Sequence, residues 1–256
     1  MVTRYPEERT SLILATDLDG TFAGGTADDR DRLQRTLREL PDTVLIYVTG
    51  RSVPAAREIM RDAPLPHPDY LIADVGTSFR GGPDLDPIEE IEAQIEAVWP
   101  GGGEIRERMT GVAGLEEQQI DADRRVSYWI RHGSMDEAIG RAADALVGLE
   151  VDLVASADVY LDVLPRGVNK GSTLRRVLRW LDRGDADVVV AGDTLNDLAL
   201  FETGLCGVVV GNCEAALLER VRGREHLFFA SGDGAAGILE GLRHFGWLME
   251  GSPHGE

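Results

Sequence analysis

The chain has 256 residues, and 45 Asp and Glu against 26 Lys and Arg give it a formal net charge of −19 at pH 7. Nucleic acid and anionic membrane surfaces repel so acidic a chain, so we expect neither as a partner. No apolar run approaches the roughly 18 residues of a membrane span, and residues 1–10 lack the apolar core of a signal peptide. Two cysteines, Cys206 and Cys213, are too few for a disulfide framework or a zinc site, which favours a cytoplasmic protein.

The N-terminal third alternates short apolar runs with amphipathic segments. The pattern predicts strands at 11–16, 43–49 and 69–74 and helices at 27–40 and 53–61. The alternation returns near the C-terminus, with helices at 170–182, 194–202, 214–220 and 235–245 and strands at 187–191, 207–211 and 227–230. Strands and helices that alternate with short connections are typical of a parallel sheet covered by helices.

The middle of the chain has a different pattern. After the break at Gly81-Gly-Pro83 we predict a helix at 87–99, strands at 115–121 and 126–131, a helix at 135–149, and strands at 151–155 and 159–164. Helices followed by antiparallel hairpins indicate an α+β unit. We therefore expect an α/β protein in which residues 1–82 and 163–256 form a Rossmann-like parallel-sheet core. Residues 83–162 form an α+β cap inserted into it.

Polar residues follow three of the predicted core strands. Asp17-Leu-Asp19-Gly-Thr21 follows the first strand, Thr49-Gly50-Arg-Ser52 the second, and Gly192-Asp193-Thr-Leu-Asn196-Asp197 the strand at 187–191. Open α/β sheets place their ligand sites at the carboxyl ends of their strands. Each segment alone has an ordinary explanation as a polar turn or a helix cap. Together they predict one site.

Lys170 is the only lysine of the chain; the other 25 of its 26 basic residues are arginines. It opens a predicted helix, where the positive end of the helix dipole disfavours a cation. The exception indicates a need for a compact ammonium rather than a planar guanidinium. Four neighbouring carboxylates would repel one another, and Mg²⁺ and this ammonium would relieve the repulsion. The set therefore indicates a pocket for a phosphoryl group.

Taken in order, these segments resemble the four motifs of the haloacid-dehalogenase-like hydrolases. The inserted unit resembles the α/β (type IIB) cap of that superfamily, and the segments 70–77, 161–171 and 235–245 are similar to its sucrose-phosphate phosphatase branch. The resemblance implies a phosphatase acting on a small sugar phosphate, either sucrose 6-phosphate or a related disaccharide or glycoside phosphate.

The resemblance also implies a role for each residue. Asp17 is the expected nucleophile, which forms an aspartyl-phosphate, and Asp19 the expected general acid and base. Mg²⁺ is expected on the carboxylates of Asp17 and Asp193 and the backbone carbonyl of Asp19, with Asp197 in the same metal set. The phosphoryl group is expected on Thr49, Gly50, Lys170 and Asn196.

One segment departs from that branch. Its members usually carry a sugar-contacting lysine before the Leu-Pro stretch, whereas residues 156–162 here contain none. Arg125 and Arg131 are the candidates to replace it, so the identity of the sugar stays open. Two other functions stay open as well: a phosphosugar mutase of the phosphomannomutase type, and a non-catalytic module that binds a sugar phosphate.

Overall fold

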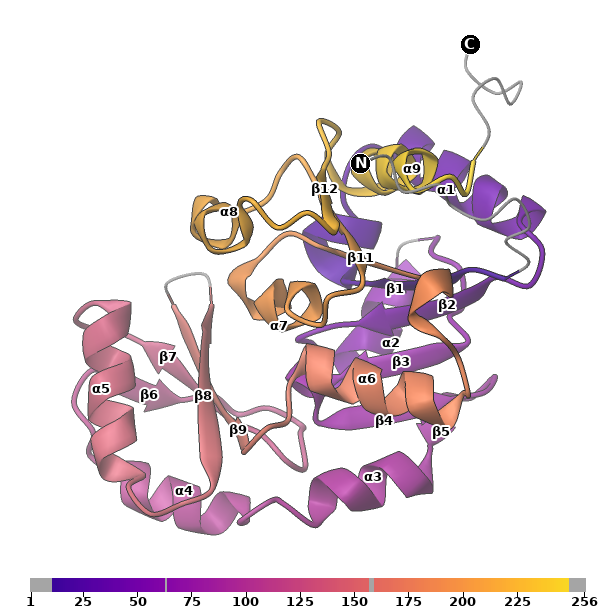
Figure 1. The fold of residues 1–256 in the computed structure, drawn as a ribbon. Helices are drawn as coiled ribbons and strands as arrows, with labels where there is room; N and C mark the ends of the chain where they lie inside the picture. The colour runs from indigo at the N-terminus through magenta and orange to yellow at the C-terminus, as the bar shows by residue number, and fades with distance from the viewer. Residues whose placement is uncertain (1–10, 63, 157–158, 249–256) are drawn as a thin grey trace.

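The computed structural model describes residues 11–62, 64–156 and 159–248, so the expectation about a signal peptide in residues 1–10 lies outside the described residues. Within these ranges the strands form one sheet of eight and one of four, which lie in separate lobes (Figure 1). No helix in the described ranges is long and apolar enough to cross a membrane.

The larger sheet has the order β12-β11-β10-β1-β2-β3-β4-β5. Six strands run parallel: β1 (Ile13–Thr16), β2 (Val44–Val48), β3 (Tyr70–Ala73), β10 (Val188–Gly192), β11 (Cys206–Val209) and β12 (Leu227–Phe229). The antiparallel strands β4 (Ser78–Gly81) and β5 (Asp86–Pro87) extend one edge. Thr16, the last residue of β1, pairs with Ala191 on one side and Tyr47 on the other. The polar segments that follow these three strands therefore begin side by side.

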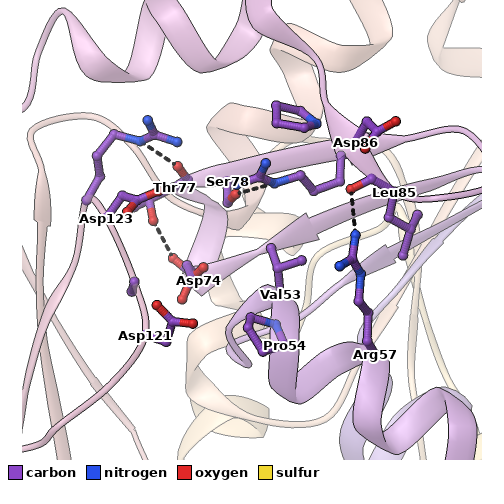
Figure 2. A pocket seen from close by; sticks show the side chains of 14 residues that line it. Val53, Pro54, Arg57, Asp74, Thr77, Ser78, Leu85, Asp86, Asp121 and Asp123 are labelled. Atoms are coloured by element: carbon purple, nitrogen blue, oxygen red, sulfur yellow. Dashed lines mark hydrogen bonds between the residues drawn. The ribbon is translucent and has the colours of Figure 1, made fainter.

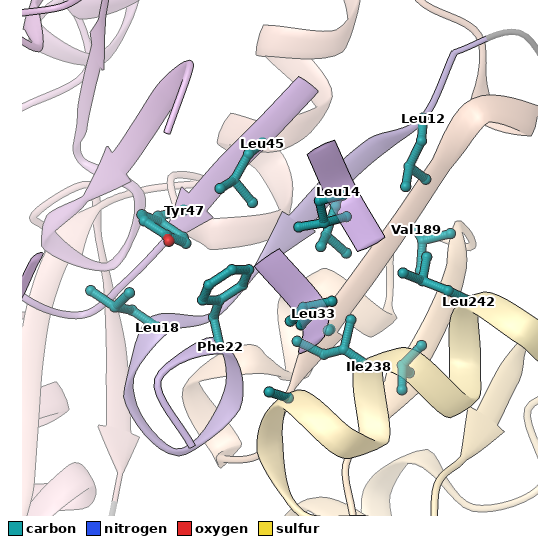
Figure 3. Packing of buried hydrophobic residues seen from close by; sticks show 14 of the residues in the cluster. Leu12, Leu14, Leu18, Phe22, Leu33, Leu45, Tyr47, Val189, Ile238 and Leu242 are labelled. Carbon is teal, nitrogen blue, oxygen red and sulfur yellow. The ribbon is translucent and has the colours of Figure 1, made fainter. Parts of the chain in front are cut away.

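Helices cover both faces of the larger sheet. α1 (Ala27–Glu39), α2 (Val53–Asp62) and α9 (Gly234–His244) pack against one face, and Figure 3 shows part of that cluster. The opposite face packs against α3 (Glu89–Glu96), α6 (Lys170–Trp180), α7 (Leu198–Phe201) and α8 (Ala215–Val221). Ile13 and Leu14 enter opposite clusters because successive strand residues point to opposite faces.

The smaller sheet is antiparallel, with the order β6-β7-β9-β8. Its strands are β6 (Leu115–Glu117), β7 (Val126–Ile130), β8 (Val151–Ser156) and β9 (Tyr160–Pro165). Helices α4 (Gly102–Met109) and α5 (Met135–Ala145) pack against one face through apolar side chains. β8 lies close to the turn Leu195–Asp197 of the larger lobe. The smaller sheet therefore borders the segments that follow the core strands.

The α/β architecture with an inserted α+β unit is confirmed, and both expected antiparallel strand pairs form. The expected inserted unit began at residue 83 and ended at residue 162, but the elements near these two limits do not divide there. β5 pairs with β4, and α3 buries Ile91 and Ile95 in the core. β9 continues to Pro165 within the smaller sheet. We therefore propose that the inserted unit runs from about residue 99 to about residue 166.

Candidate active site

The predicted site residues gather where β1, β2 and β10 end. Asp17 follows β1, and its backbone N–H donates to the carbonyl of Ala191 on β10 over 2.9 Å. Its side chain is buried. Asp193 and Asp197 follow β10, and both are buried as well. The parallel register of β1 and β10 therefore brings together carboxylates that lie far apart in the sequence.

Lys170 is the centre of a buried network. Its Nζ donates to one carboxylate or amide oxygen each of Asp17, Asn196 and Asp197, at 2.6 Å in every case. An ammonium has three N–H donors, so all three are used. Burial lowers the pKa of Lys170, but the attraction of Asp17 and Asp197 outweighs this and raises it above its usual range. Lys170 is therefore a fully charged and fully bonded cation.

A helix cap fixes Lys170 in this position. Asn169 precedes α6, and its side chain accepts from the backbone N–H of Ser172 over 2.8 Å. The Ser172 hydroxyl accepts from the Asn169 N–H over 2.9 Å, which completes a capping box. Lys170 is thus the first residue of α6. The two carboxylates around its ammonium offset the unfavourable helix dipole.

Three carboxylates form a cluster that could hold a metal ion. Asp17, Asp193 and Asp197 each offer an oxygen, and these oxygens lie within 4.8 Å of one another. Burial raises the pKa of the Asp17 carboxyl well above its usual range; Lys170 opposes this shift, while the charges of Asp197 and Asp193 add to it. Burial, reinforced by the charge of Asp197, raises the pKa of Asp193 to about 7. Such crowding favours a bound cation.

The hydrogen bonds distinguish the three carboxylates. Asp197 Oδ1 accepts from Lys170, and its Oδ2 accepts from the backbone N–H groups of Asp193 and Thr194, each over 3.0 Å. Asp193 Oδ1 accepts from the Thr21 hydroxyl over 2.7 Å. Asp17 Oδ1 accepts from Lys170, and within the described chain no group donates to its Oδ2. Asp197 therefore accepts the most hydrogen bonds of the three carboxylates, and Asp17 accepts the fewest.

Asp19 lies outside this cluster. Its carboxylate accepts a forked pair from Arg51, over 2.7 Å from Nε and 2.8 Å from Nη2. The Asp19 side chain is 46% exposed, so it lies at the rim of the site. Gly20 separates the rim from the cluster with a positive φ of 72°, and a Cβ there would stand 2.2 Å from Asp193 Oδ2. Only glycine therefore allows this turn to approach Asp193.

Thr49 and Gly50 border the cluster from the end of β2. The Thr49 hydroxyl is buried and accepts from the backbone N–H of Arg51 over 3.1 Å. A Cβ built on Gly50 would lie 3.5 Å from Asn196 Nδ2, so this residue faces the amide whose oxygen binds Lys170. The structure thus brings seven of the eight predicted residues to one cluster or its border, and Asp19 to the rim.

Three neighbours of the site were not predicted. Thr21, which donates to Asp193, and Arg51, which donates to Asp19, both belong to the polar segments recognised in the sequence. Their place in those segments was a signal that they lie near the site. Asn212 donates to the Gly20 carbonyl over 3.0 Å and accepts from the Gly234 N–H over 2.8 Å. Asn212 lies shortly after the end of β11, just as Asp193 lies after the end of β10. A polar residue at the end of a core strand was the signal that could have predicted it.

The two candidate sugar-contacting arginines differ. Arg131 is exposed, pairs with Glu116 over 2.8 Å, and stacks over Trp129. Arg125 is buried, and its guanidinium donates to the Gly50 carbonyl and to Asp74.

A cavity of about 250 Å³ lies beside the site, where the inserted unit meets the core (Figure 2). Its lining includes Val53, Pro54 and Arg57 from α2, Asp74 and Thr77 after β3, and the segment 121–124. None of the eight predicted site residues lines it. The carboxylate cluster therefore does not form part of the cavity wall.

A family comparison agrees with this geometry. The model of the family sucrose-6F-phosphate phosphohydrolase matches residues 10–246. The chain belongs to this family. The resemblance to the haloacid-dehalogenase-like hydrolases and their sucrose-phosphate phosphatase branch is therefore confirmed, and the chain is a member of a phosphatase family.

Individual relatives cover most of the chain. It is 41% identical over 237 residues to a glucosylglycerol-phosphate synthase of Pseudomonas anguilliseptica, covering 93% of this chain but only 31% of that protein. It is 33% identical over 241 residues to a mannosylfructose-phosphate phosphatase of Agrobacterium fabrum, covering 91% and 96%. A sucrose-phosphatase structure from Synechocystis sp. PCC6803, in complex with sucrose and phosphate, matches with a TM-score of 0.84 at 27% identity, covering 93% and 98%.

Proposed function

We propose that this chain is a Mg²⁺-dependent phosphatase that hydrolyses a phosphorylated glycoside through an aspartyl-phosphate on Asp17. The observation that carries the proposal is the asymmetry of the Asp17 carboxylate. Lys170 binds its Oδ1 over 2.6 Å, whereas within the described residues its Oδ2 accepts no hydrogen bond. A buried carboxylate with one oxygen fixed and the other available suits attack on phosphorus.

The surrounding residues take the remaining roles. Asp19, half-exposed at the rim, protonates the leaving sugar oxygen and then takes a proton from the attacking water. The Thr49 hydroxyl, the Gly50 amide and the Asn196 amide hold the phosphoryl oxygens, over which negative charge is spread in the transition state. Lys170, whose three N–H groups already bind Asp17, Asn196 and Asp197, contributes its positive charge to the same site.

The residues present fit a divalent cation. Mg²⁺ prefers hard oxygen donors, and the cluster offers buried carboxylates with raised pKa values. Asp17 and Asp193, with the backbone carbonyl of Asp19, would hold the ion. Asp197, whose two oxygens bind Lys170 and two backbone amides, supports this arrangement from behind. When bound, the ion would neutralise the carboxylates and polarise the phosphoryl group.

The relatives suggest the class of substrate. The chain spans about a third of the glucosylglycerol-phosphate synthase, and a phosphatase-like segment within such a synthase would act on its product. The mannosylfructose-phosphate phosphatase also acts, by its name, on a phosphorylated glycoside. Because residues 156–162 lack the lysine of the sucrose-phosphate branch, we propose glucosylglycerol phosphate before sucrose 6-phosphate or mannosylfructose phosphate. The expected cytoplasmic location is part of the same proposal.

The test is phosphate release from these three substrates, with Mg²⁺ or with EDTA, by the wild type and by Asp17→Asn. We expect turnover of at least one glycoside phosphate, lost in the variant and in EDTA. Equal inactivity of both proteins on every ester, with tight sugar-phosphate binding retained, would instead indicate a binding module. Migration of the phosphoryl group on the sugar without release would indicate a mutase.

A further inference from the structure

Arg125 connects the inserted unit to the core. It directly precedes β7 of the smaller sheet, and it is only 7% exposed. Its Nη1 donates to the backbone carbonyl of Gly50, and its Nη2 donates to Asp74 Oδ1, each over 2.9 Å. Both acceptors belong to the larger lobe. One side chain of the insertion therefore holds two core loops.

Those two loops support each other. The backbone N–H of Val75 donates to the Thr49 carbonyl over 3.1 Å, and that of Asp74 donates to the Arg51 carbonyl over 2.8 Å. The loop after β3 thus backs the Thr49–Gly50 loop, whose groups face the site. Arg125 binds one residue in each of these loops, which fixes their relative position.

The supporting loop is strained. Asp74 and Val75 have φ angles of 53° and 59°. A β-branched residue rarely adopts this left-handed conformation, which persists only where neighbouring contacts impose it. The bond from Arg125 to Asp74 is one such contact. Strain of this kind is typical of functional loops.

The electrostatics are also costly. Arg125 lies 3.5 Å from Asp162 Oδ1 in addition to its bond with Asp74, and all three side chains are buried. Burial raises the pKa of Asp74 to about 6 despite the attraction of Arg125. Buried ion pairs often add little to stability compared with apolar residues of the same size. A positional role explains the ion pair better than a gain in stability does.

We propose that Arg125 is the positioning residue through which the inserted unit holds the Thr49–Gly50 loop for phosphoryl binding. The proposal rests on the proposed function of that loop. It differs from the role expected from the sequence, a sugar contact, because both terminal nitrogens of Arg125 bind the core. It follows that losing Arg125 weakens the binding of every phosphate compound, whatever group the phosphate carries.

The test compares Arg125→Gln with Arg108→Gln. Arg108 in α4 also donates to a backbone carbonyl, that of Val147 over 2.8 Å, and to a carboxylate, that of Glu104 over 2.7 Å. Arg108 therefore matches Arg125 in its types of hydrogen-bond partner, but it is more exposed and both of its partners lie within the inserted unit. Calorimetry with Mg²⁺ gives the Kd of inorganic phosphate, and kcat/KM is measured on p-nitrophenyl phosphate and on glucosylglycerol phosphate.

We expect Arg125→Gln to raise the phosphate Kd about tenfold, as for a lost hydrogen bond to a charged group. Both kcat/KM values fall by the same factor, while Arg108→Gln changes neither. A loss confined to the sugar substrate, with unchanged phosphate binding, would overturn the proposal in favour of a sugar contact. Unchanged phosphate binding and activity on both substrates would also overturn it.

A double variant guards against a merely unfolded protein. Arg125→Gln combined with Asp74→Asn removes both charges of the pair, and circular dichroism and Tm confirm that it folds. We expect its phosphate binding to stay weak. Full recovery of binding would show that the single variant acted only through an unpaired buried charge, and would reject the positioning role. Failure of the proposed function is a distinct result: the wild type would bind phosphate more tightly than Arg125→Gln does, yet hydrolyse no ester.

Discussion

Lys170 shows how one side chain organises the site. It is fully buried and bonded to Asp17, Asn196 and Asp197, and no other lysine occurs in the chain. Without its charge, Asp17 and Asp197 would face each other unopposed in a desolvated site. The ammonium therefore both orients the proposed nucleophile and makes the cluster tolerable in the folded state.

Replacing Lys170 by Met is expected to abolish turnover and to lower the free energy of unfolding by about 3–5 kcal/mol, because it leaves buried charges unpaired. Urea unfolding in EDTA measures the stability change. Arg131→Met, which breaks an exposed pair with Glu116, is the control and should change stability by less than about 1 kcal/mol. A Lys170→Met protein as stable as the wild type would contradict this account.

Asp193 provides a separate test of the metal site. Adding Mg²⁺ to EDTA-treated wild type should raise its Tm, because a ligand that binds only the folded state stabilises it. Asp193→Asn should show no such shift, since it removes one of the carboxylates proposed to hold the ion. Asp185→Asn, at an exposed carboxylate paired with Arg175, should respond like the wild type. Equal shifts in all three proteins would argue against a cation at the cluster.

Lys170 is part of helix α6, and the close contact between α6 and α7 fixes the position of α6. A Cβ on Gly171 would stand 1.9 Å from the carbonyl oxygen of Ala199. Gly140 in α5 offers a contrast, because it is exposed and no atom lies within 4 Å of a Cβ built there. Gly171 is thus required by packing, whereas Gly140 is not.

Gly171→Ala should lower the free energy of unfolding by about 1–3 kcal/mol through overpacking, and should lower kcat by displacing Lys170. Gly140→Ala should raise stability by about 0.5–1 kcal/mol, because alanine is the better helix former. Thermal unfolding of the two variants compares these effects. If both substitutions stabilised the protein, there would be room for a side chain between Gly171 and Ala199, which would contradict the close packing of α6 against α7.

Local signals predicted some elements well and others not at all. α6 begins at the predicted Lys170 because Asn169 caps it. β4 and β5 were missed because strands of four and two residues beside glycines have too little periodicity. α4 was missed because it begins with glycines, which are poor helix formers. β4, β5 and α4 therefore depend on tertiary packing more than on local sequence.

The positions of the site residues could be predicted because they follow adjacent parallel strands. The pairing of Asp19 with Arg51 and the bonds of Arg125 could not, because they depend on side-chain conformations and on how the insertion meets the core. The catalytic and metal roles of these residues stay predictions.

The chain carries a formal net charge of −19 at pH 7. Self-repulsion destabilises a compact chain of high net charge, and salt with a Debye length of about 10 Å at 0.1 M screens it. We therefore expect the Tm in EDTA to rise as NaCl increases from about 0.05 to about 0.5 M. A Tm that stays constant or falls would show that local ion pairs outweigh the net repulsion.

In the proposed reaction, the Asp17 carboxylate attacks phosphorus. The most direct measurement is acid quenching of the enzyme during turnover, followed by mass spectrometry of the peptide that contains Asp17. We expect this peptide to carry a phosphoryl group on Asp17 and the Asp17→Asn protein to carry none. Phosphate release with Asp17 unmodified at every time would mean that water attacks the substrate directly, and would contradict the proposed reaction.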